Sequence, residues 1–296
     1  MPVRQHTTTP SAWLGAVCTG RRRWCLSPAA TLTLVPALVF FCAFWLLPFC
    51  YLIALGSMPD NSSGLNAYWT ILTRPRYLIS LGVTALLSLL VSVAAVGVAG
   101  IIGCFLARNK FPGKSLLLAI LTFPLAFPGV VVGFLVIMLA GRQGMFAQIG
   151  LALFGERWTF AYSLGGLFVG YLYFSIPRVI MSLMAACEKL DISLEEAAQS
   201  LGAGTWRITW DVIVPGIGPA LLSTGAICFA TSMGAFGTAF TLGTRLDILP
   251  LDIYGEFTNY ANFATAAALS VLLGAVTWLV LALARRLSST GLGSGV

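Results

Sequence analysis

Six long stretches of this sequence contain no charged residue, and they constrain the fold more than any other feature. Each is at least roughly 20 residues long, the length that an α-helix needs to cross the hydrocarbon core of a bilayer. The stretches are residues 24–59, 77–107, 115–141, 158–177, 212–244 and 257–284. They are apolar all round and lack the alternation of membrane β-strands. The sequence therefore predicts an all-α membrane protein with six transmembrane helices.

Composition excludes several classes of protein. Charged residues make up only 9% of the chain and the mean hydropathy is +0.91, whereas soluble proteins carry about 25% charged residues. A soluble enzyme, a disordered tail protein and a nucleic-acid-binding protein are excluded on this ground. The expected helices lie at about 30–56, 78–107, 116–140, 159–180, 217–243 and 260–284. They form a transmembrane domain, 28–285, between a polar tail, 1–27, and a disordered Gly/Ser-rich tail, 286–296.

The distribution of Lys and Arg predicts the orientation. Six spans place both termini on one side of the membrane. With the termini in the cytoplasm, 12 of the 17 basic residues lie inside and 5 lie outside, as the positive-inside rule requires. Arg21–Arg23 followed by an apolar run is similar to a signal peptide, but that run is far longer than the roughly 7–15 residues of a signal sequence. We therefore expect an uncleaved first helix.

Two expected helices carry features typical of a solute pathway. Two prolines interrupt the third helix, and each removes a backbone hydrogen bond; the kink either lines a cavity or is a plain packed kink. The fifth contains "ATSMGAFGTAFTLG", whose hydroxyls either line a pathway or bond across helices. The candidate pathway residues are Pro124, Pro128, Ser232, Met233, Phe236 and Thr238.

Other chemistry is sparse. The seven cysteines form no CxxC pair and fall mostly in apolar runs, so we expect small hydrophobic side chains and no disulfide or metal site. His6 is the single histidine, and no phosphate-binding loop pattern occurs, so the chain itself should hold neither metal nor ATP. Arg178 follows Pro177 near the expected inner end of the fourth helix, where it would reach the membrane interface.

The segment 187–216, hereafter the 187–216 loop, is the most charged and most sharply patterned part of the chain. Ser193 and Glu196 have the S-x-x-E spacing of a capping box, which predicts a helix N-terminus at Ser193. Gly202 falls where a glycine ends a helix. The loop therefore contains a helix of about two turns, which needs a packing partner because short helices are marginal alone.

A second short helix is expected over 206–214. Thr205 could cap it, and Trp206 and Trp210 lie on one face at helical spacing. Two short helices joined at glycine make a compact knob with apolar residues on its surface. Such a knob needs a soluble partner or the surface of the bilayer.

The pattern E-A-A-x3-G-x9-I-x-L-P marks the inner-membrane permeases of binding-protein-dependent ABC importers, and this sequence resembles it. The matching residues are Glu196, Ala197, Ala198, Gly202 and Pro215. Val212 and Val214 replace the pattern's Ile and Leu, and both keep an aliphatic side chain. The six-helix layout resembles the type I permease fold of these importers over residues 28–285.

The resemblance implies a permease subunit, not an enzyme, in a bacterial inner membrane. It implies a cytoplasmic ABC ATPase dimer that binds ATP and Mg²⁺, a second permease subunit that shares the pathway, and an extracytoplasmic solute-binding protein. The residues implied to couple to the ATPase are Glu195, Glu196, Ala197, Ala198, Gly202, Ala203 and Pro215. Which glutamate meets the ATPase stays open, because a capping-box Glu196 would bond its own helix and leave Glu195 freer.

The solute is less well indicated. "MGAFGTAFTLG" followed by "LPLDIYGEF" resembles the branch that contains polyamine (spermidine/putrescine), aminophosphonate, ferric-iron and sulfate permeases, and we favour a polyamine-type solute. The alternative function is an ion-coupled secondary transporter. It is weakened because no Asp or Glu lies inside an expected helix.

Overall fold

The computed structural model describes residues 28–57, 66–243 and 246–290, and every regular element in these ranges is a helix. The expected tail 1–27 lies outside them, and so do residues 291–296 of the expected tail 286–296. Residues 286–290 continue the last helix, α15 (Phe263–Thr290), so the expected disorder is wrong for them. The chain divides into two compact units, residues 1–50 and 51–296. The all-helical expectation is confirmed.

The first unit contains one apolar helix. It comprises α1 (Pro28–Phe41), the π-helical turn η1 (Cys42–Leu46) and the start of α2 (Leu47–Ser57). Phe41, Trp45 and Phe49 stack in sequence, with ring centroids 4.9 Å and 5.5 Å apart. The helix expected at about 30–56 is confirmed.

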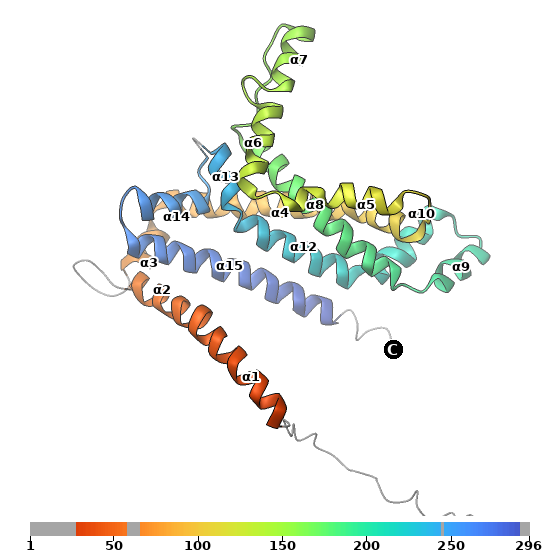
Figure 1. The fold of residues 1–296 in the computed structure, drawn as a ribbon, viewed down its shortest axis with the longest axis horizontal. Helices are drawn as coiled ribbons and strands as arrows, with labels where there is room; N and C mark the ends of the chain where they lie inside the picture. Colours follow the sequence, from red (N-terminus) through yellow and green to blue (C-terminus); the bar gives the residue numbers. More distant parts are fainter. Residues whose placement is uncertain (1–27, 58–65, 244–245, 291–296) are drawn as a thin grey trace, which may run out of the picture. The chain divides into compact units, whose positions relative to one another are not determined.

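The second unit contains the remaining elements. They are α3 (Asn66–Thr73), α4 (Pro75–Arg108), α5 (Lys114–Thr122), η2 (Phe123–Ala126), α6 (Gly129–Ala140), α7 (Met145–Phe154), α8 (Leu164–Glu188), α9 (Ile192–Ser200), α10 (Thr205–Ile208), η3 (Thr209–Ile213), α11 (Val214–Gly216), α12 (Gly218–Met233), α13 (Phe236–Leu242), α14 (Leu249–Thr258) and α15 (Phe263–Thr290). Figure 1 shows α4, α8, α12 and α15 running together, while α6 and α7 leave this group at a steep angle.

The centre of this unit is the pair α4 and α8, which pack against each other. Ala95 and Ala99 on α4 are fully buried. A Cβ atom on Gly103 would lie 3.1 Å from the carbonyl oxygen of Ile180 and 3.2 Å from the amide nitrogen of Met184. Because these residues are small, the two backbones touch, as helices in membranes do when small residues face each other.

The number of spans reaches the expected six only when one bent pair of helices is counted. Within the described ranges, five helices are long and apolar enough to cross a membrane, and six if the bent pair 205–216 and 218–233 counts as one span. One of the five is 129–154, which comprises α6 and α7 and is shifted from the expected 116–140. The third expected helix, 116–140, is divided into α5, η2 and α6. The fifth, 217–243, is divided into α12 and α13, and α8 continues to Glu188, beyond its expected end near 180.

Three segments expected to be loops contain helices. They are α3, α7 and α14, within the expected loops 57–76, 141–158 and 244–258. Counting charge-free runs cannot detect them, because each is shorter than a span and lies next to charged residues. Tertiary contacts hold α14: Leu249 is fully buried and its amide donates a hydrogen bond of 2.9 Å to the hydroxyl of Thr84 on α4.

Candidate functional site

The first helix of the 187–216 loop begins earlier than the sequence indicates. Asp191 is the N-cap of α9, and its carboxylate accepts a hydrogen bond of 3.0 Å from the amide of Ser193. This bond lowers the pKa of Asp191 below its ordinary value, because it stabilises the charged carboxylate. The expected capping box of Ser193 and Glu196 is therefore wrong. Ser193 lies inside the helix, and Glu196 is left exposed.

The end of α9 is as predicted. Gly202 has φ +82°, and its amide donates to the carbonyl of Gln199 at 2.9 Å. The amide of Ala203 donates to the carbonyl of Ala198 at 3.1 Å. These two bonds form a Schellman motif, in which a left-handed residue ends the helix. Glycine adopts this conformation without the clash that a Cβ atom brings.

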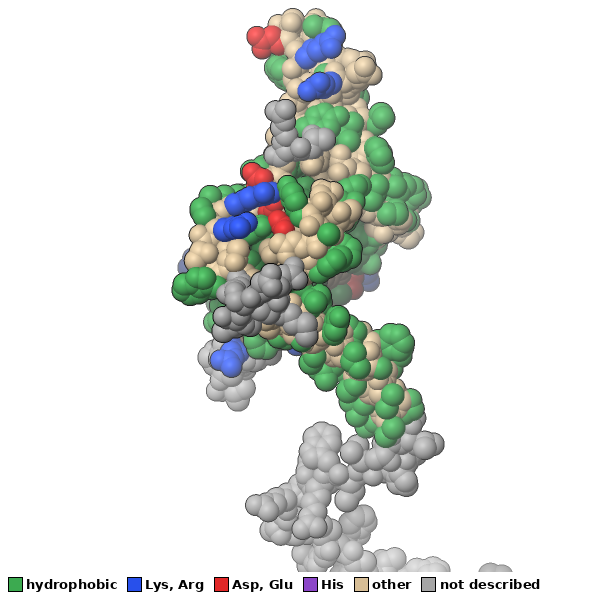
Figure 2. Space-filling model, turned by 90° about the vertical axis from the view of Figure 1, so that its left-hand side faces the viewer, with side chains coloured by type: hydrophobic (Ala, Val, Ile, Leu, Met, Phe, Trp, Pro, Cys, Tyr) green, Lys and Arg blue, Asp and Glu red, His purple; other side chains and the backbone are tan. Residues whose placement is uncertain are grey.

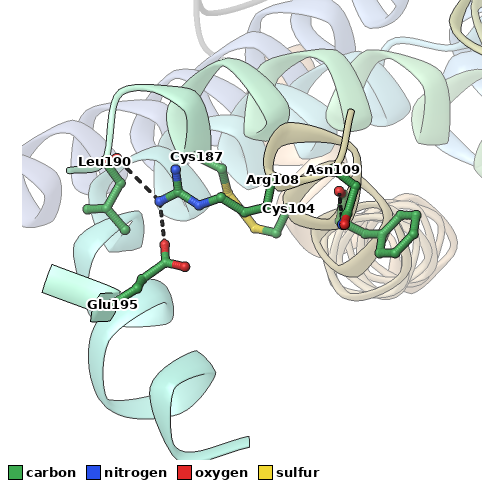
Figure 3. Close-up of a disulfide and its surroundings, with 7 residues drawn as sticks. Cys104, Arg108, Asn109, Cys187, Leu190 and Glu195 are labelled. Carbon is green, nitrogen blue, oxygen red and sulfur yellow. Dashed lines mark hydrogen bonds and ion pairs between the residues drawn. A yellow bond between two sulfur atoms is a disulfide. The ribbon is translucent and has the colours of Figure 1, made fainter. Parts of the chain in front are cut away.

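Arg108 at the end of α4 fastens the loop to the membrane-spanning helices (Figure 3). Its guanidinium forms an ion pair with Glu195 on α9 and donates a hydrogen bond of 3.3 Å to the carbonyl oxygen of Leu190. Only 18% of the Arg108 side chain and 14% of the Glu195 side chain are exposed. Glu195 is therefore engaged inside the protein, and Glu196 is the glutamate offered to solvent.

Sequence reasoning did not single out Arg108. It was counted only as one of the basic residues expected on the cytoplasmic side. Its partner Leu190 lies 82 residues further along the chain, and Glu195 lies beyond Leu190. No local spacing could therefore have revealed the pairing. The one available signal was a lone arginine at the end of a long apolar run.

A disulfide joins α4 and α8 beside this ion pair, between Cys104 and Cys187 (Figure 3). The expectation that the cysteines are only small hydrophobic side chains is wrong for this pair. The close approach of the helices at Gly103 brings the two Cα atoms to 5.6 Å, within the usual range for a disulfide. The sequence separation is 83 residues, so the pairing has no local signature.

The second half of the loop is a continuous helical segment from Thr205 to Gly216, formed by α10, η3 and α11. Gly204 is its N-cap, so the expected cap by Thr205 is wrong. Trp206 and Trp210 pack edge to face on the surface, with ring centroids 5.8 Å apart. Pro215 lies within α11, and the chain bends by 68° before α12 begins.

The loop has an apolar, hollowed surface. A cavity of about 290 Å³ lies between α9 and the segment that follows it. Leu201 and Trp206 are 88% and 76% exposed, and Leu201 lies outside every candidate membrane span. Ala198, Gly202 and Ala203 line the cavity. Within the described residues, no cluster of three or more His, Cys, Asp or Glu side chains could hold a metal ion.

The two interrupted helices meet at their breaks. The Thr238 hydroxyl on α13 donates a hydrogen bond of 2.9 Å to the carbonyl oxygen of Gly129, where α6 begins. A Cβ atom on Gly237 would lie 3.0 Å from the amide nitrogen of Val130. Pro124 lies in η2, and Pro128 is the N-cap of α6. The prolines thus mark a true break in the helix, and glycine contacts join it to the second break.

A cavity of about 340 Å³ lies between the two breaks. Pro124 and Thr238, both candidates from the sequence, line it together with Thr231 and Arg178. Because α8 ends only at Glu188, Arg178 lies ten residues, or about 15 Å, from the helix end. The expectation that Arg178 lies near the inner helix end is therefore wrong.

The other pathway candidates lie elsewhere. Ser232 and Met233 are fully buried in packing around α12. Phe236 lines a separate apolar cavity of about 390 Å³, where its ring lies 5.3 Å from that of Tyr254. The structure therefore brings Pro124 and Thr238 together at one cavity and separates Ser232, Met233 and Phe236 from it.

The end of the unit where α3 and α14 lie carries a charged cluster. Arg76 pairs with Asp252 at 3.1 Å, and the Tyr77 hydroxyl donates a hydrogen bond of 2.7 Å to Glu256. A hollow of about 310 Å³ adjoins them and is also lined by Arg74. Figure 2, which views the molecule from this side, shows basic and acidic side chains gathered together. The cluster ties α14 to the start of α4.

Comparison with known proteins identifies one family. The family described as "Binding-protein-dependent transport system inner membrane component" matches residues 99–289. The matched range contains the 187–216 loop, both helix breaks, Arg108 and Arg178.

Individual relatives agree with this match. The chain is 32% identical to the sulfate transport system permease protein CysT of Escherichia coli (strain K12) over 253 residues, covering 84% of this chain and 88% of the relative. It is 37% identical to the molybdenum transport system permease protein ModB of the same organism over 165 residues, covering 54% of this chain and 71% of the relative. A bacterial ABC transporter involved in the import of the acidic polysaccharide alginate has a similar fold, with a TM-score of 0.73 at 17% identity over 88% of this chain and 95% of that one.

Proposed function

This chain belongs to the family of binding-protein-dependent transport system inner membrane components, and from this membership we propose what it carries and how it is coupled to ATP. It is the multi-pass permease subunit of an ABC importer in the inner membrane. Its relatives are transport permeases and not enzymes.

We propose that the solute is a small tetrahedral oxyanion of the sulfate or molybdate type. The observation that carries this is the 32% identity to a sulfate permease over 84% of the chain, together with the 37% identity to a molybdenum permease. These relatives give no support to the polyamine-type solute favoured from the sequence. In this assembly the chain pairs with a second permease, and an extracytoplasmic binding protein delivers the solute.

We propose that the 187–216 loop is the docking site for a cytoplasmic ATPase dimer, which binds ATP and Mg²⁺. The loop offers exposed Leu201 and Trp206 beside a cavity, which suits a protein partner. Of the two glutamates, Glu196 is exposed, whereas Glu195 is paired with Arg108. Glu196 therefore contacts the ATPase, and Glu195 holds the loop in place.

The small side chains of the loop have matching roles in this proposal. Ala197, Ala198 and Ala203 allow close approach of the partner, and Gly202 makes the turn. Pro215 lies where the loop bends into α12. With the loop in the cytoplasm, both termini lie there too, in agreement with the excess of Lys and Arg on that side.

The function is tested with the whole transporter in proteoliposomes, with ATP enclosed and the solute-loaded binding protein outside. We expect uptake of radioactive sulfate or molybdate that requires ATP and persists when proton and sodium gradients are collapsed. Uptake that follows an ion gradient without ATP would instead support the secondary transporter.

The docking site is tested separately with Glu196→Ala and a matched control, Gln199→Ala, an exposed residue on the same helix. We expect Glu196→Ala to weaken ATPase binding by about 5- to 30-fold, the effect of losing an interfacial contact of about 1–2 kcal/mol. The control should bind the ATPase normally. Equal affinity in both variants would contradict the assignment of Glu196.

A further inference from the structure

Arg178 lies where an arginine is costly. It lies in α8, about 21 Å from the start of the helix at Leu164 and about 15 Å from its end at Glu188. The hydrocarbon core is about 30 Å thick, and α8 is a candidate membrane span, so Arg178 lies in the interior of this span and at neither of its ends. A charged residue at the centre of a span is rare and marks a functional site.

No described element that packs against α8 supplies a counter-ion for this charge. The elements packed against α8 are α4, α5, η2, α6, α12 and α13. None of their sequences contains an Asp or a Glu. The ion pairs of the described residues involve Asp252, Glu195 and Asp211, all on other elements. Within the described part of the chain, Arg178 forms neither an ion pair nor a hydrogen bond.

The surroundings of Arg178 form a cavity with the chemistry of an anion site. Its volume of about 340 Å³ falls at the lower end of the range for small-molecule pockets. Thr231 and Thr238 contribute hydroxyl-bearing side chains, and the helix breaks place irregular backbone at the cavity wall. Irregular backbone at membrane depth is tolerated where it is buried or lines a water-filled cavity.

We propose that Arg178 is the residue of the translocation pathway that binds the transported oxyanion as it passes between the two helix breaks. The planar guanidinium presents several N–H donors to a tetrahedral oxyanion. A solute anion supplies the negative charge that the neighbouring helices lack. The bound anion can leave again because Arg178 is the single cation that holds it in the cavity. The inference rests on the proposed function, since it assigns a residue to the same solute.

The test measures ATP-driven uptake of sulfate and molybdate by the reconstituted transporter carrying Arg178→Gln, Arg178→Lys or Arg142→Gln. Arg142 is an exposed arginine between α6 and α7 that does not line the cavity, so it is the matched control. Two further readouts are co-purification of the ATPase and ATP hydrolysis stimulated by the loaded binding protein. They report assembly and coupling, which depend on the 187–216 loop and not on Arg178.

We expect Arg178→Gln to lower the maximal uptake rate about 10- to 100-fold, the effect of losing a charged hydrogen bond. Assembly and stimulated ATP hydrolysis should persist. Arg178→Lys keeps the charge and should retain part of the uptake, and Arg142→Gln should match the wild type. Wild-type uptake by Arg178→Gln would overturn the inference, and so would loss of assembly in both Arg178 variants, which indicates a structural role. If the wild type takes up neither anion, the proposed solute itself is wrong and the inference falls with it.

Discussion

The ion pair between Arg108 and Glu195 connects the membrane-spanning helices to the 187–216 loop, and removing it should uncouple transport from ATP hydrolysis. Arg108 ends α4, and Glu195 lies in the first turns of α9. The same guanidinium also binds the carbonyl oxygen of Leu190, just before that helix. The substitution Glu195→Gln removes the charge and preserves the size of the side chain.

The expected magnitude follows from the burial of the pair. Two unit charges about 4 Å apart attract by about 4 kcal/mol at an effective dielectric constant of about 20. Desolvation and the ordering of two side chains oppose this attraction. With 18% and 14% of the side chains exposed, solvent screens the pair less than a surface pair, which contributes about 0–1 kcal/mol. We expect a coupling energy of about 1.5–3 kcal/mol.

The assay is a double-mutant cycle with Arg108→Met, Glu195→Gln and the double variant in the purified transporter. Thermal unfolding reports the coupling energy, and solute molecules transported per ATP hydrolysed report the function. Glu195→Gln should lower this ratio severalfold while the ATPase still binds, because Glu196 and the apolar surface of the loop remain.

The chain contains its own control. Arg207 and Asp211 form an ion pair of the same charge type in the same loop, but their side chains are 78% and 63% exposed. Asp211→Asn should cost less than about 0.5 kcal/mol of stability in the unfolding measurement. If the cycle at Arg108 and Glu195 gives no more coupling energy than this exposed pair, the reasoning from burial is refuted.

Three further predictions use matched positions. Gly202→Val forces a β-branched side chain to φ +82° and should destabilise the loop by about 1–2 kcal/mol. Gly202→Asp should abolish ATP-driven uptake although the chain is still inserted in the membrane. Gly204→Ser changes a glycine at negative φ in open space, so it should leave both the stability of the loop and the uptake unchanged. Gly103→Val should lower the stability of the protein in detergent by about 1–3 kcal/mol, because the added side chain separates α4 from α8. In the control Gly97→Val the new side chain points into open space, so this variant should unfold near the wild-type temperature. Tyr77→Phe leaves the buried glutamate of α14 without its 2.7 Å hydrogen bond and should cost about 1–3 kcal/mol in the same unfolding measurement.

The sequence predicted what depends on composition over many residues. Charge-free runs are set by the thickness of the bilayer, so the number of spans and the all-helical class could be inferred from length alone. The glycine at 202 was also predictable, because the left-handed end of a helix is a local requirement. Both features are encoded within a single stretch of chain.

What the sequence did not predict depends on contacts between distant segments. The sequence left open which of two adjacent glutamates is the freer one; the ion pair of Arg108 with Glu195 distinguishes them, and only the fold brings these residues together. The cap by Asp191 is a local contact that the S-x-x-E spacing obscured, since α9 begins one residue before Ser193 and the Asp191 carboxylate accepts from the Ser193 amide. The short helix α14 is stabilised by burial against α4, so its own sequence carries little signal.

The contacts at the end of α4 have a mechanical consequence. Cys104 is bonded to Cys187 near the end of α8, and Arg108 contacts both Leu190 and Glu195. The end of α8 and the start of the loop are therefore fastened to the same end of α4. A force applied to the loop is transmitted to α4 and α8 together, and not to α8 alone.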